Sequence, residues 1–243
     1  MVPALEAILA KSKNLVFFGG AGVSTESGIP DFRSVDGLYH QKFRYPPEVM
    51  LSHSFYESHT AEFFDFYRNK LIVHGAKPNA AHLRLAQLEQ QGICKAVVTQ
   101  NIDGLHQAAG SHTVYELHGS TLRNYCTRCG KFYPVEFIEE AAGQGDGIPR
   151  CTECGGIVKP DVVLYEEGLD EQTMENAIRA IAAADTLIVG GTSLAVYPAA
   201  GLLRYFRGDE LVVINKQPTP ADSMATLVLN RPIGEALSLQ AAE

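Results

Sequence analysis

The sequence predicts an open α/β fold, in which a parallel sheet has helices on both faces, with a smaller second lobe attached. Three observations lead to this prediction. Short apolar runs of strand character alternate with helical stretches, which is typical of a parallel sheet. A glycine-rich turn follows the first of these runs. Two segments that break the alternation differ in composition, and we interpret them as insertions into one domain.

Five apolar runs are predicted to be buried strands. Their continuous apolar character is typical of strands that are covered on both faces. Helices must then lie between these strands to provide the cover. The five runs are residues 14–18, 96–100, 114–117, 185–189 and 211–214.

Helices are predicted between the strands from caps and spacing. Asn79 is a candidate N-cap for a helix over residues 80–91, because its side chain can accept a hydrogen bond from the first turn. Residues 171–184 are alanine-rich with apolar side chains at helical spacing. A further helix is predicted to begin at Pro198. The first N–H groups of a helix have no partner within it, so the missing N–H of proline costs no hydrogen bond there. The apolar side of the helix after Asn79 is expected to consist of Leu83, Leu85 and Leu88.

The two insertions are predicted to pack together as the small lobe of one domain over residues 1–243. Residues 32–77 are rich in aromatic side chains and are predicted to be helical, notably over 57–71, whereas residues 119–159 carry most of the cysteines. The remaining chain forms the large lobe. That lobe is predicted to comprise residues 1–31, 78–118 and 160–243.

The composition is that of an ordinary globular chain. Of 243 residues, 46% are apolar and 20% are charged, which excludes wholesale disorder. The net charge of −8 argues against direct binding of nucleic acid, which requires basic surfaces. No apolar run reaches the roughly 18 residues of a membrane span, and the N-terminus lacks the pattern of a signal peptide. We therefore expect a cytoplasmic protein with no membrane partner.

Four of the five cysteines form two Cys-x-x-Cys pairs, separated by 21 residues. Doubled pairs of this kind are typical of a structural zinc ion held by four thiolates. The alternatives are two disulfides, which fit a cytosolic chain poorly, or a redox pair, which needs only one motif. Cys94 stands apart and is expected to be a small core residue. The predicted zinc ligands are Cys126, Cys129, Cys151 and Cys154.

The glycine-rich turn indicates a bound nucleotide. Gly20 and Gly22 follow the first strand, where glycines allow backbone N–H groups to approach a pyrophosphate. The third position of the dinucleotide fingerprint is Thr25, however, and Lys42 lies where an acidic residue would hold the ribose. The turn therefore differs from that of a dehydrogenase, although the sheet around it is still expected to be Rossmann-like.

Five motifs in order resemble those of the sirtuins, the NAD-dependent protein lysine deacylases. The resemblance covers essentially the whole chain. One departure is Gly19, where the family commonly has threonine. The motifs are Gly20-Ala-Gly-Val-Ser-Thr-Glu-Ser-Gly-Ile-Pro-Asp-Phe-Arg33, Thr99-Gln-Asn-Ile-Asp-Gly-Leu-His106, Glu116-Leu-His-Gly119, the doubled Cys-x-x-Cys, and Gly191-Thr-Ser-Leu194 followed by Val213-Ile-Asn215.

The resemblance implies a bacterial-type deacetylase that uses NAD. The acyl oxygen of the substrate attacks C1′ of NAD, nicotinamide leaves, and the products are deacetylated lysine, nicotinamide and O-acetyl-ADP-ribose. His118 matches the general base on the ribose hydroxyl, and Asn101 and Asp103 match the pair that positions ribose and nicotinamide. Taken alone, His118 would be interpreted as a satisfied histidine at a strand end, because the sequence has seven other histidines, most of which must be structural or exposed. The cofactor-binding residues implied are Gly20, Ala21, Gly22, Thr25, Phe32, Arg33, Gln100, Asn101, Ile102, Asp103, His118, Gly191, Thr192, Ser193, Asn215 and Ile233.

The implied partner is a segment of protein or peptide that contains an acylated lysine. Val163 and Tyr165 lie in a run that resembles the strand pairing with such a peptide; the alternative is an edge strand packed on the core. Family members that prefer succinyl groups carry Tyr-x-x-Arg, whereas the nearest approach here is Tyr67-x-x-Lys70. We therefore expect acetyl as the preferred group. The other functions considered are protein mono-ADP-ribosyl transfer and a non-catalytic zinc-ribbon binding module.

Overall fold

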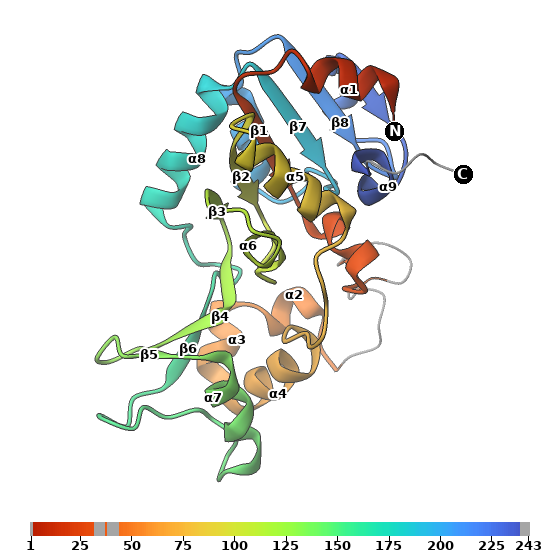
Figure 1. The fold of residues 1–243 in the computed structure, drawn as a ribbon. Coiled ribbons are helices and arrows are strands. Elements are labelled where there is room, and N and C mark those ends of the chain that lie inside the picture. The colour runs from red at the N-terminus through yellow and green to blue at the C-terminus, as the bar shows by residue number, and fades with distance from the viewer. Residues whose placement is uncertain (1, 32–36, 38–43, 239–243) are drawn as a thin grey trace.

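The computed structural model describes residues 2–31, 37 and 44–238, and its larger sheet has six strands (Figure 1). Their order is β3-β2-β1-β7-β8-β9, and every neighbouring pair is parallel. The predicted α/β fold is therefore confirmed. The strands are β1 (Leu15–Gly19), β2 (Cys94–Thr99), β3 (Val114–Glu116), β7 (Thr186–Gly190), β8 (Glu210–Ile214) and β9 (Leu227–Leu229).

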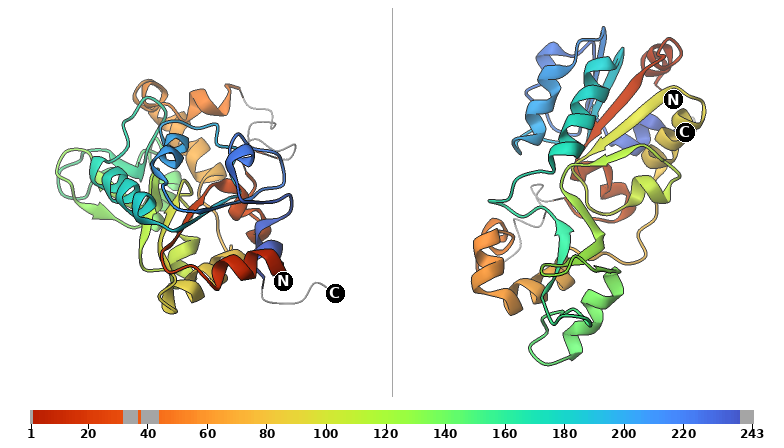
Figure 2. Two further views of the ribbon diagram at one scale, coloured as in Figure 1. Left: turned by 90° about the horizontal axis from the view of Figure 1, so that it is seen from above. Right: turned by 90° about the vertical axis from the view of Figure 1, so that its left-hand side faces the viewer.

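Helices cover both faces of this sheet (Figure 2). Along β1, Leu15 and Phe17 pack into a core on one face, and Val16 and Phe18 pack into a core on the other. Successive side chains of a strand point to opposite faces, so burial on both sides requires the continuous apolar run seen in the sequence. The first face is covered by α1 (Pro3–Leu9), α5 (Ala80–Gln90) and α9 (Ile233–Leu237), and the second by α8 (Glu171–Ala183) and the 3₁₀ helix η5 (Ala199–Tyr205).

Helix α5 begins as predicted. The Asn79 side chain accepts a hydrogen bond from Ala81 N at 3.0 Å, and Asn79 N donates to His82 Nδ1 at 3.2 Å. The expected apolar side is only partly correct, because Leu85 and Leu88 are buried whereas Leu83 is 54% exposed. At about 100° per residue, Leu83 lies on nearly the opposite side of the helix from Leu85, so the packing that buries Leu85 leaves Leu83 facing solvent.

A second sheet of three antiparallel strands lies apart from the first, in the order β5-β4-β6 (Figure 1). Its strands share a hydrophobic core with the helices of residues 47–71. The strands are β4 (Gly119–Cys126), β5 (Phe132–Tyr133) and β6 (Val158–Val162), and the helices packed here are α2 (Pro47–Met50), α3 (His53–Ser58), α4 (Thr60–Lys70) and α7 (Val135–Glu140).

Three predicted elements differ in the structure. The helix predicted over 57–71 is two helices, because the backbone leaves helical geometry at His59. The segment after Pro198 is a 3₁₀ helix. The run that holds Val163 and Tyr165, which resembles a peptide-pairing strand, lies just after β6 (Val158–Val162), and Tyr165 forms one isolated bridge to Ser52.

Several short elements connect the main ones. They are α6 (Leu105–Ala108) and the 3₁₀ turns η1 (Ala21–Val23), η2 (Thr25–Ser27), η4 (Ala141–Gly143) and η6 (Asp222–Met224). Within the described ranges, every helix is too short or too polar to cross a membrane.

Candidate active site and metal centre

The candidate site lies at the carboxyl edge of the parallel sheet, around the end of β1. Strand β1 has β2 on one side and β7 on the other, so the strand order changes direction between β1 and β7. Open α/β sheets bind ligands outside the carboxyl ends of their strands at such a switch point. Most of the predicted cofactor residues follow the ends of β1, β2, β7 and β8, which brings them to one edge, whereas His118 follows β3 and Ile233 begins α9.

The glycines of the two loops beside β1 are in direct backbone contact. Gly22 N donates to Gly191 O at 2.8 Å. A Cβ on Gly22 would lie 2.8 Å from Gly191 Cα, and a Cβ on Gly191 would lie 2.4 Å from Val23 N. Gly191 also has a φ of 58°, which side chains disfavour. Only glycine therefore permits these two turns to approach each other this closely.

Polar side chains lie along the same edge of the sheet, on both sides of these two glycine turns. Gln100 Nε2 donates to Thr192 Oγ1 at 3.2 Å, which connects the ends of β2 and β7. Ser193 is exposed beside Thr192. Asn215 lies just beyond β8, where its Nδ2 donates to Gln217 O at 2.8 Å. These positions form a row of hydrogen-bonding side chains along the carboxyl edge of the sheet.

Asn101 and Asp103 are joined through a serine that the sequence reasoning missed. Ser24 Oγ donates to Asp103 Oδ2 at 2.6 Å and accepts from Asn101 Nδ2 at 3.0 Å. Asp103 Oδ1 also accepts from Leu105 N at 2.9 Å. Ser24 is 1% exposed. Its place inside the glycine-rich motif was the available signal, but nothing local revealed its partners 77 and 79 residues away.

His118 lies between β3 and β4, where the chain passes from the parallel sheet to the small sheet. Its Nδ1 is 3.0 Å from Gln100 O. A carbonyl oxygen only accepts, so Nδ1 carries the proton and Nε2 of the neutral ring is left as an acceptor. Burial lowers the pKa of His118 below its ordinary 6.5, although the Gln100 contact opposes this shift. The ring is therefore neutral at pH 7 and suited to accept a proton.

The remaining predicted cofactor residues have varied surroundings. Thr25 Oγ1 donates to Gly22 O at 3.0 Å, within the glycine-rich turn, and Ala21 is half-buried there. Ile102 is half-buried against the core of the small sheet. Ile233 is 2% exposed and fills the space beside Gly190, so most of its surface is used in packing. The predicted residues Phe32 and Arg33 lie outside the described residues.

The predicted substrate residues follow β6 and directly adjoin His118. Val163 N donates to His118 O at 3.0 Å, and Tyr165 N donates to Leu51 O at 3.0 Å. Leu164 N donates to the Glu167 carboxylate at 2.8 Å. All three N–H groups are therefore used within the chain, and the carbonyl oxygens of Leu164 and Tyr165 accept hydrogen bonds from Glu167 N and His53 N.

The four cysteines of the doubled motif converge, and their Sγ atoms all lie within 4.8 Å of one another. Cys126 and Cys154 are 3.4 Å apart, and Cys129 and Cys151 are 3.6 Å apart. Zinc–sulfur bonds of about 2.3 Å in a tetrahedron place sulfurs about 3.8 Å apart, so the donor set fits one zinc ion. With four sulfur ligands, such an ion leaves no position for substrate and is structural.

Two further sequence-based interpretations concern side chains outside the site. Cys94 is 2% exposed, and burial raises the pKa of its thiol to about 12, as expected for a core residue. Tyr67 is fully buried, stacks on Phe63 with ring centroids 5.8 Å apart, and belongs to the small-sheet core. Lys70 is exposed at the end of α4.

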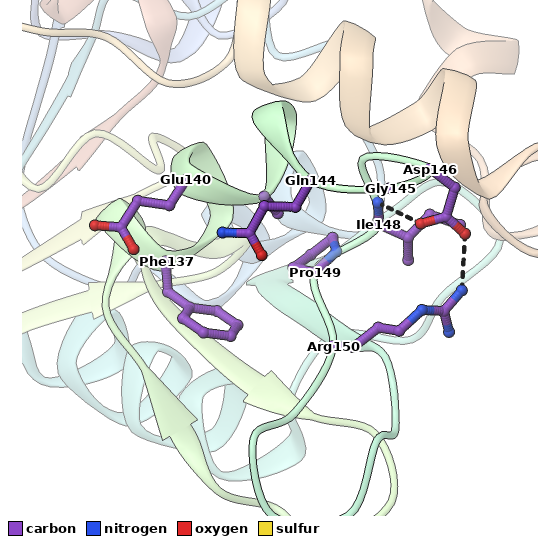
Figure 3. A pocket seen from close by; sticks show the side chains of 9 residues that line it. Phe137, Glu140, Gln144, Gly145, Asp146, Ile148, Pro149 and Arg150 are labelled. Carbon is purple, nitrogen blue, oxygen red and sulfur yellow. Dashed lines mark hydrogen bonds and ion pairs between the residues drawn. The ribbon is translucent and has the colours of Figure 1, made fainter.

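A cavity of about 230 Å³ lies beside the small sheet, away from the cofactor edge (Figure 3). It is lined by residues of α7 and of the turn over 144–150, where Asp146 pairs with Arg150 at 2.8 Å. None of its lining residues is a predicted site residue. The cavity is therefore separate from the candidate active site.

Several known proteins are similar to this chain over most of its length. The family model described as "SIR2: Sir2 family" matches residues 20–198. An NAD-dependent protein deacetylase of Clostridium acetobutylicum is 62% identical over 96% of this chain and 95% of its own, and one of Clostridium perfringens is 61% identical over the same shares. A solved structure of Sir2 with a p53 peptide and NAD⁺ has a TM-score of 0.86 and 40% identity, covering 98% of this chain and 95% of that one. A Sir2 histidine-to-alanine variant with deacetylated p53 peptide and 3′-O-acetyl-ADP-ribose has a TM-score of 0.87 and 39% identity, covering 96% and 94%.

Proposed function

Because the chain belongs to the Sir2 family, we propose that it is an NAD-dependent protein lysine deacetylase. The overall reaction converts acetyl-lysine, NAD and water into lysine, nicotinamide and O-acetyl-ADP-ribose. NAD bound at the sheet edge supplies an electron-poor C1′ once its bond to nicotinamide breaks, and the acetyl oxygen of the substrate is the nucleophile.

The observation that carries the proposal is the orientation of His118. Its Nδ1 is occupied by Gln100 O, and its lowered pKa keeps Nε2 unprotonated at neutral pH. A neutral imidazole with a free nitrogen acts as a general base. We assign His118 the removal of a proton from a ribose hydroxyl.

The other polar groups position the reactants in this proposal. Asp103 is held by Ser24 and Leu105 N, so its carboxylate is fixed before substrate arrives. Asn101 is oriented by the same serine. We assign these groups the placement of ribose and nicotinamide, and the glycine turns around Gly22 and Gly191 the close approach of the pyrophosphate.

The four cysteines bind one zinc ion that stabilises the small sheet and takes no part in the chemistry. We also assign the protein to the cytoplasm, where reducing conditions keep these thiols available to the metal. Its partners in this proposal are acetylated segments of other proteins, and its acidic surface, with a net charge of −8, suits lysine-rich segments better than nucleic acid or membrane.

Mass spectrometry of an acetyl-lysine peptide tests the proposal, with and without NAD. The expected result is NAD-dependent loss of acetyl, with nicotinamide and O-acetyl-ADP-ribose formed together. His118→Ala should abolish this activity, whereas His112→Ala, at an exposed histidine outside the site, should retain it. ADP-ribose accumulating on protein without deacetylation would instead favour the transferase, and no reaction with NAD would favour a binding module.

A further inference from the structure

The segment over residues 163–167 is fixed between the predicted base and the helices of the small lobe. Val163 N donates to His118 O at 3.0 Å. Two residues later, Tyr165 N donates to Leu51 O and Tyr165 O accepts from His53 N, both at 3.0 Å. Any displacement of this segment therefore changes the position of a bound peptide relative to His118.

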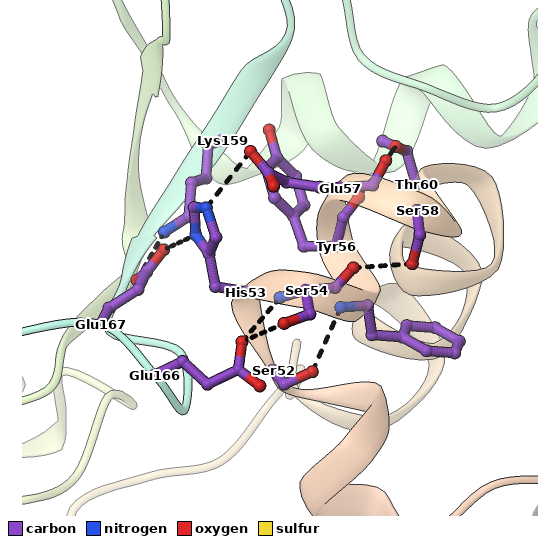
Figure 4. Close-up of polar contacts among 11 residues, drawn as sticks. Ser52, His53, Ser54, Tyr56, Glu57, Ser58, Thr60, Lys159, Glu166 and Glu167 are labelled. Atoms are coloured by element: carbon purple, nitrogen blue, oxygen red, sulfur yellow. Dashed lines mark hydrogen bonds and ion pairs between the residues drawn. The ribbon is translucent and has the colours of Figure 1, made fainter.

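The Glu167 carboxylate contacts three parts of the chain, and Figure 4 shows two of these contacts, with Lys159 and with His53. It accepts from Leu164 N at 2.8 Å, from Lys159 Nζ at 3.1 Å and from His53 Nδ1 at 2.8 Å. Its side chain is 20% exposed. One group thus connects the segment itself, strand β6 and helix α3.

The groups around Glu167 favour the ionised form of its carboxyl group. Burial raises its pKa, but the hydrogen bond from Leu164 N and the contacts with His53 and Lys159 outweigh burial and lower it overall. Since a carboxylate oxygen only accepts, His53 Nδ1 must donate. His53 Nε2 lies 3.3 Å from Glu57, so both ring nitrogens face acids, which raises the pKa of His53.

The backbone turn at Glu166, beside Glu167, is stabilised by contacts with other segments of the chain. Glu166 has a φ of 78°, a conformation that residues with side chains rarely adopt. Its carboxylate accepts from Ser54 N at 2.9 Å and from Ser54 Oγ, again at the start of α3. Side chains from α3 and β6 therefore hold a backbone shape that local preference does not favour.

We propose that Glu167 is a positioning residue for the acylated peptide: by binding Leu164 N, Lys159 and His53 together, it holds the substrate segment against the His118 loop. This inference rests on the proposed function, because it takes residues 163–165 as the peptide-binding segment. Glu167 acts through the backbone of that segment and does not touch the reacting atoms.

Steady-state kinetics with separately varied peptide and NAD test the proposal. In Glu167→Gln, the amide NH₂ group replaces one carboxylate oxygen and so faces groups that donate hydrogen bonds. This change should raise the KM for acetyl-lysine peptide about tenfold. The KM for NAD should change by less than about twofold. His53→Ala, at a half-exposed side chain, should raise the peptide KM about threefold. Glu57→Gln is the matched control, since Glu57 contacts His53 on the exposed side and should leave both constants near wild type.

The combined variant gives a second readout that a merely structural role would not produce. If Glu167 and His53 act through one contact, Glu167→Gln with His53→Ala should raise the peptide KM no further than Glu167→Gln alone. An unchanged peptide KM in Glu167→Gln, or equal increases in the KM for peptide and for NAD, would overturn the inference while leaving the deacetylase activity of the wild type intact. A wild-type protein without NAD-dependent deacetylation would overturn the proposed function itself.

Discussion

Replacing Ser24 with alanine should damage catalysis more than any local feature of the sequence suggests. Ser24 is 1% exposed, and its hydroxyl donates to Asp103 at 2.6 Å while accepting from Asn101 at 3.0 Å. Ser24→Ala removes both hydrogen bonds at once. Asn101 Nδ2 then loses the acceptor that Ser24 provided. Asp103 loses the Ser24 donor and keeps the hydrogen bond from Leu105 N.

The size of the expected loss in activity follows from the negative charge of Asp103, which accepts the hydrogen bond of Ser24. A hydrogen bond to a charged group contributes about 1.5–3 kcal/mol, and about 1.4 kcal/mol corresponds to a tenfold change in rate. If the full contribution is expressed in the transition state, kcat/KM for NAD should fall about 10- to 100-fold. The free energy of unfolding should fall by about 1–3 kcal/mol, which lowers Tm by about 2–4 °C per kcal/mol in a chain of this size.

The assay is release of nicotinamide at saturating acetyl-lysine peptide and varied NAD, with Tm measured on the same samples. Ser111→Ala is the matched control, because Ser111 is 3% exposed and its Oγ has no hydrogen-bond partner among the described residues. A kcat/KM for Ser24→Ala within about twofold of wild type, or an equal loss in Ser111→Ala, would refute the reasoning.

Four further outcomes are expected. Removal of zinc with a chelator should unfold the small sheet and reduce activity, as followed by metal analysis and circular dichroism; full activity at verified zero zinc would contradict the structural role. The acid limb of the pH profile of kcat/KM should lie below pH 6.5, since the pKa of His118 is lowered and the base is lost only as pH falls through that value; a limb above 6.5 would contradict the assignment. Leu85→Ala should cost about 2–5 kcal/mol in chemical denaturation because Leu85 is fully buried, whereas Leu83→Ala, 54% exposed, should cost less than about 0.5 kcal/mol. At equal peptide concentration, acetyl-lysine should be consumed faster than succinyl-lysine, because the sequence has no Tyr-x-x-Arg to bind a carboxylate; faster removal of succinyl would refute that preference.

The sequence by itself determined the features whose physical cause lies within a short stretch of chain. The buried strands follow from continuous apolar runs such as residues 15–18, and the start of α5 follows from the capping side chain of Asn79. The zinc site follows from the spacing of two Cys-x-x-Cys pairs, because each pair places two thiolates on one turn. Local patterns did not reveal the strands of the small sheet, because β5 has only two residues and the strands β4 and β6 mix polar and apolar side chains.

Only the tertiary structure decided the contacts between distant segments. Ser24 meets Asp103 across 79 residues, and His53 meets Glu167 across 114. The hydrogen bond to Gln100 O that leaves Nε2 of His118 as the base, and the burial that lowers the pKa of His118, likewise depend on which chain segments pack around it. These properties arise from hydrogen bonds and burial that exist only when the parallel sheet and the small sheet are assembled, so no short window of sequence contains them.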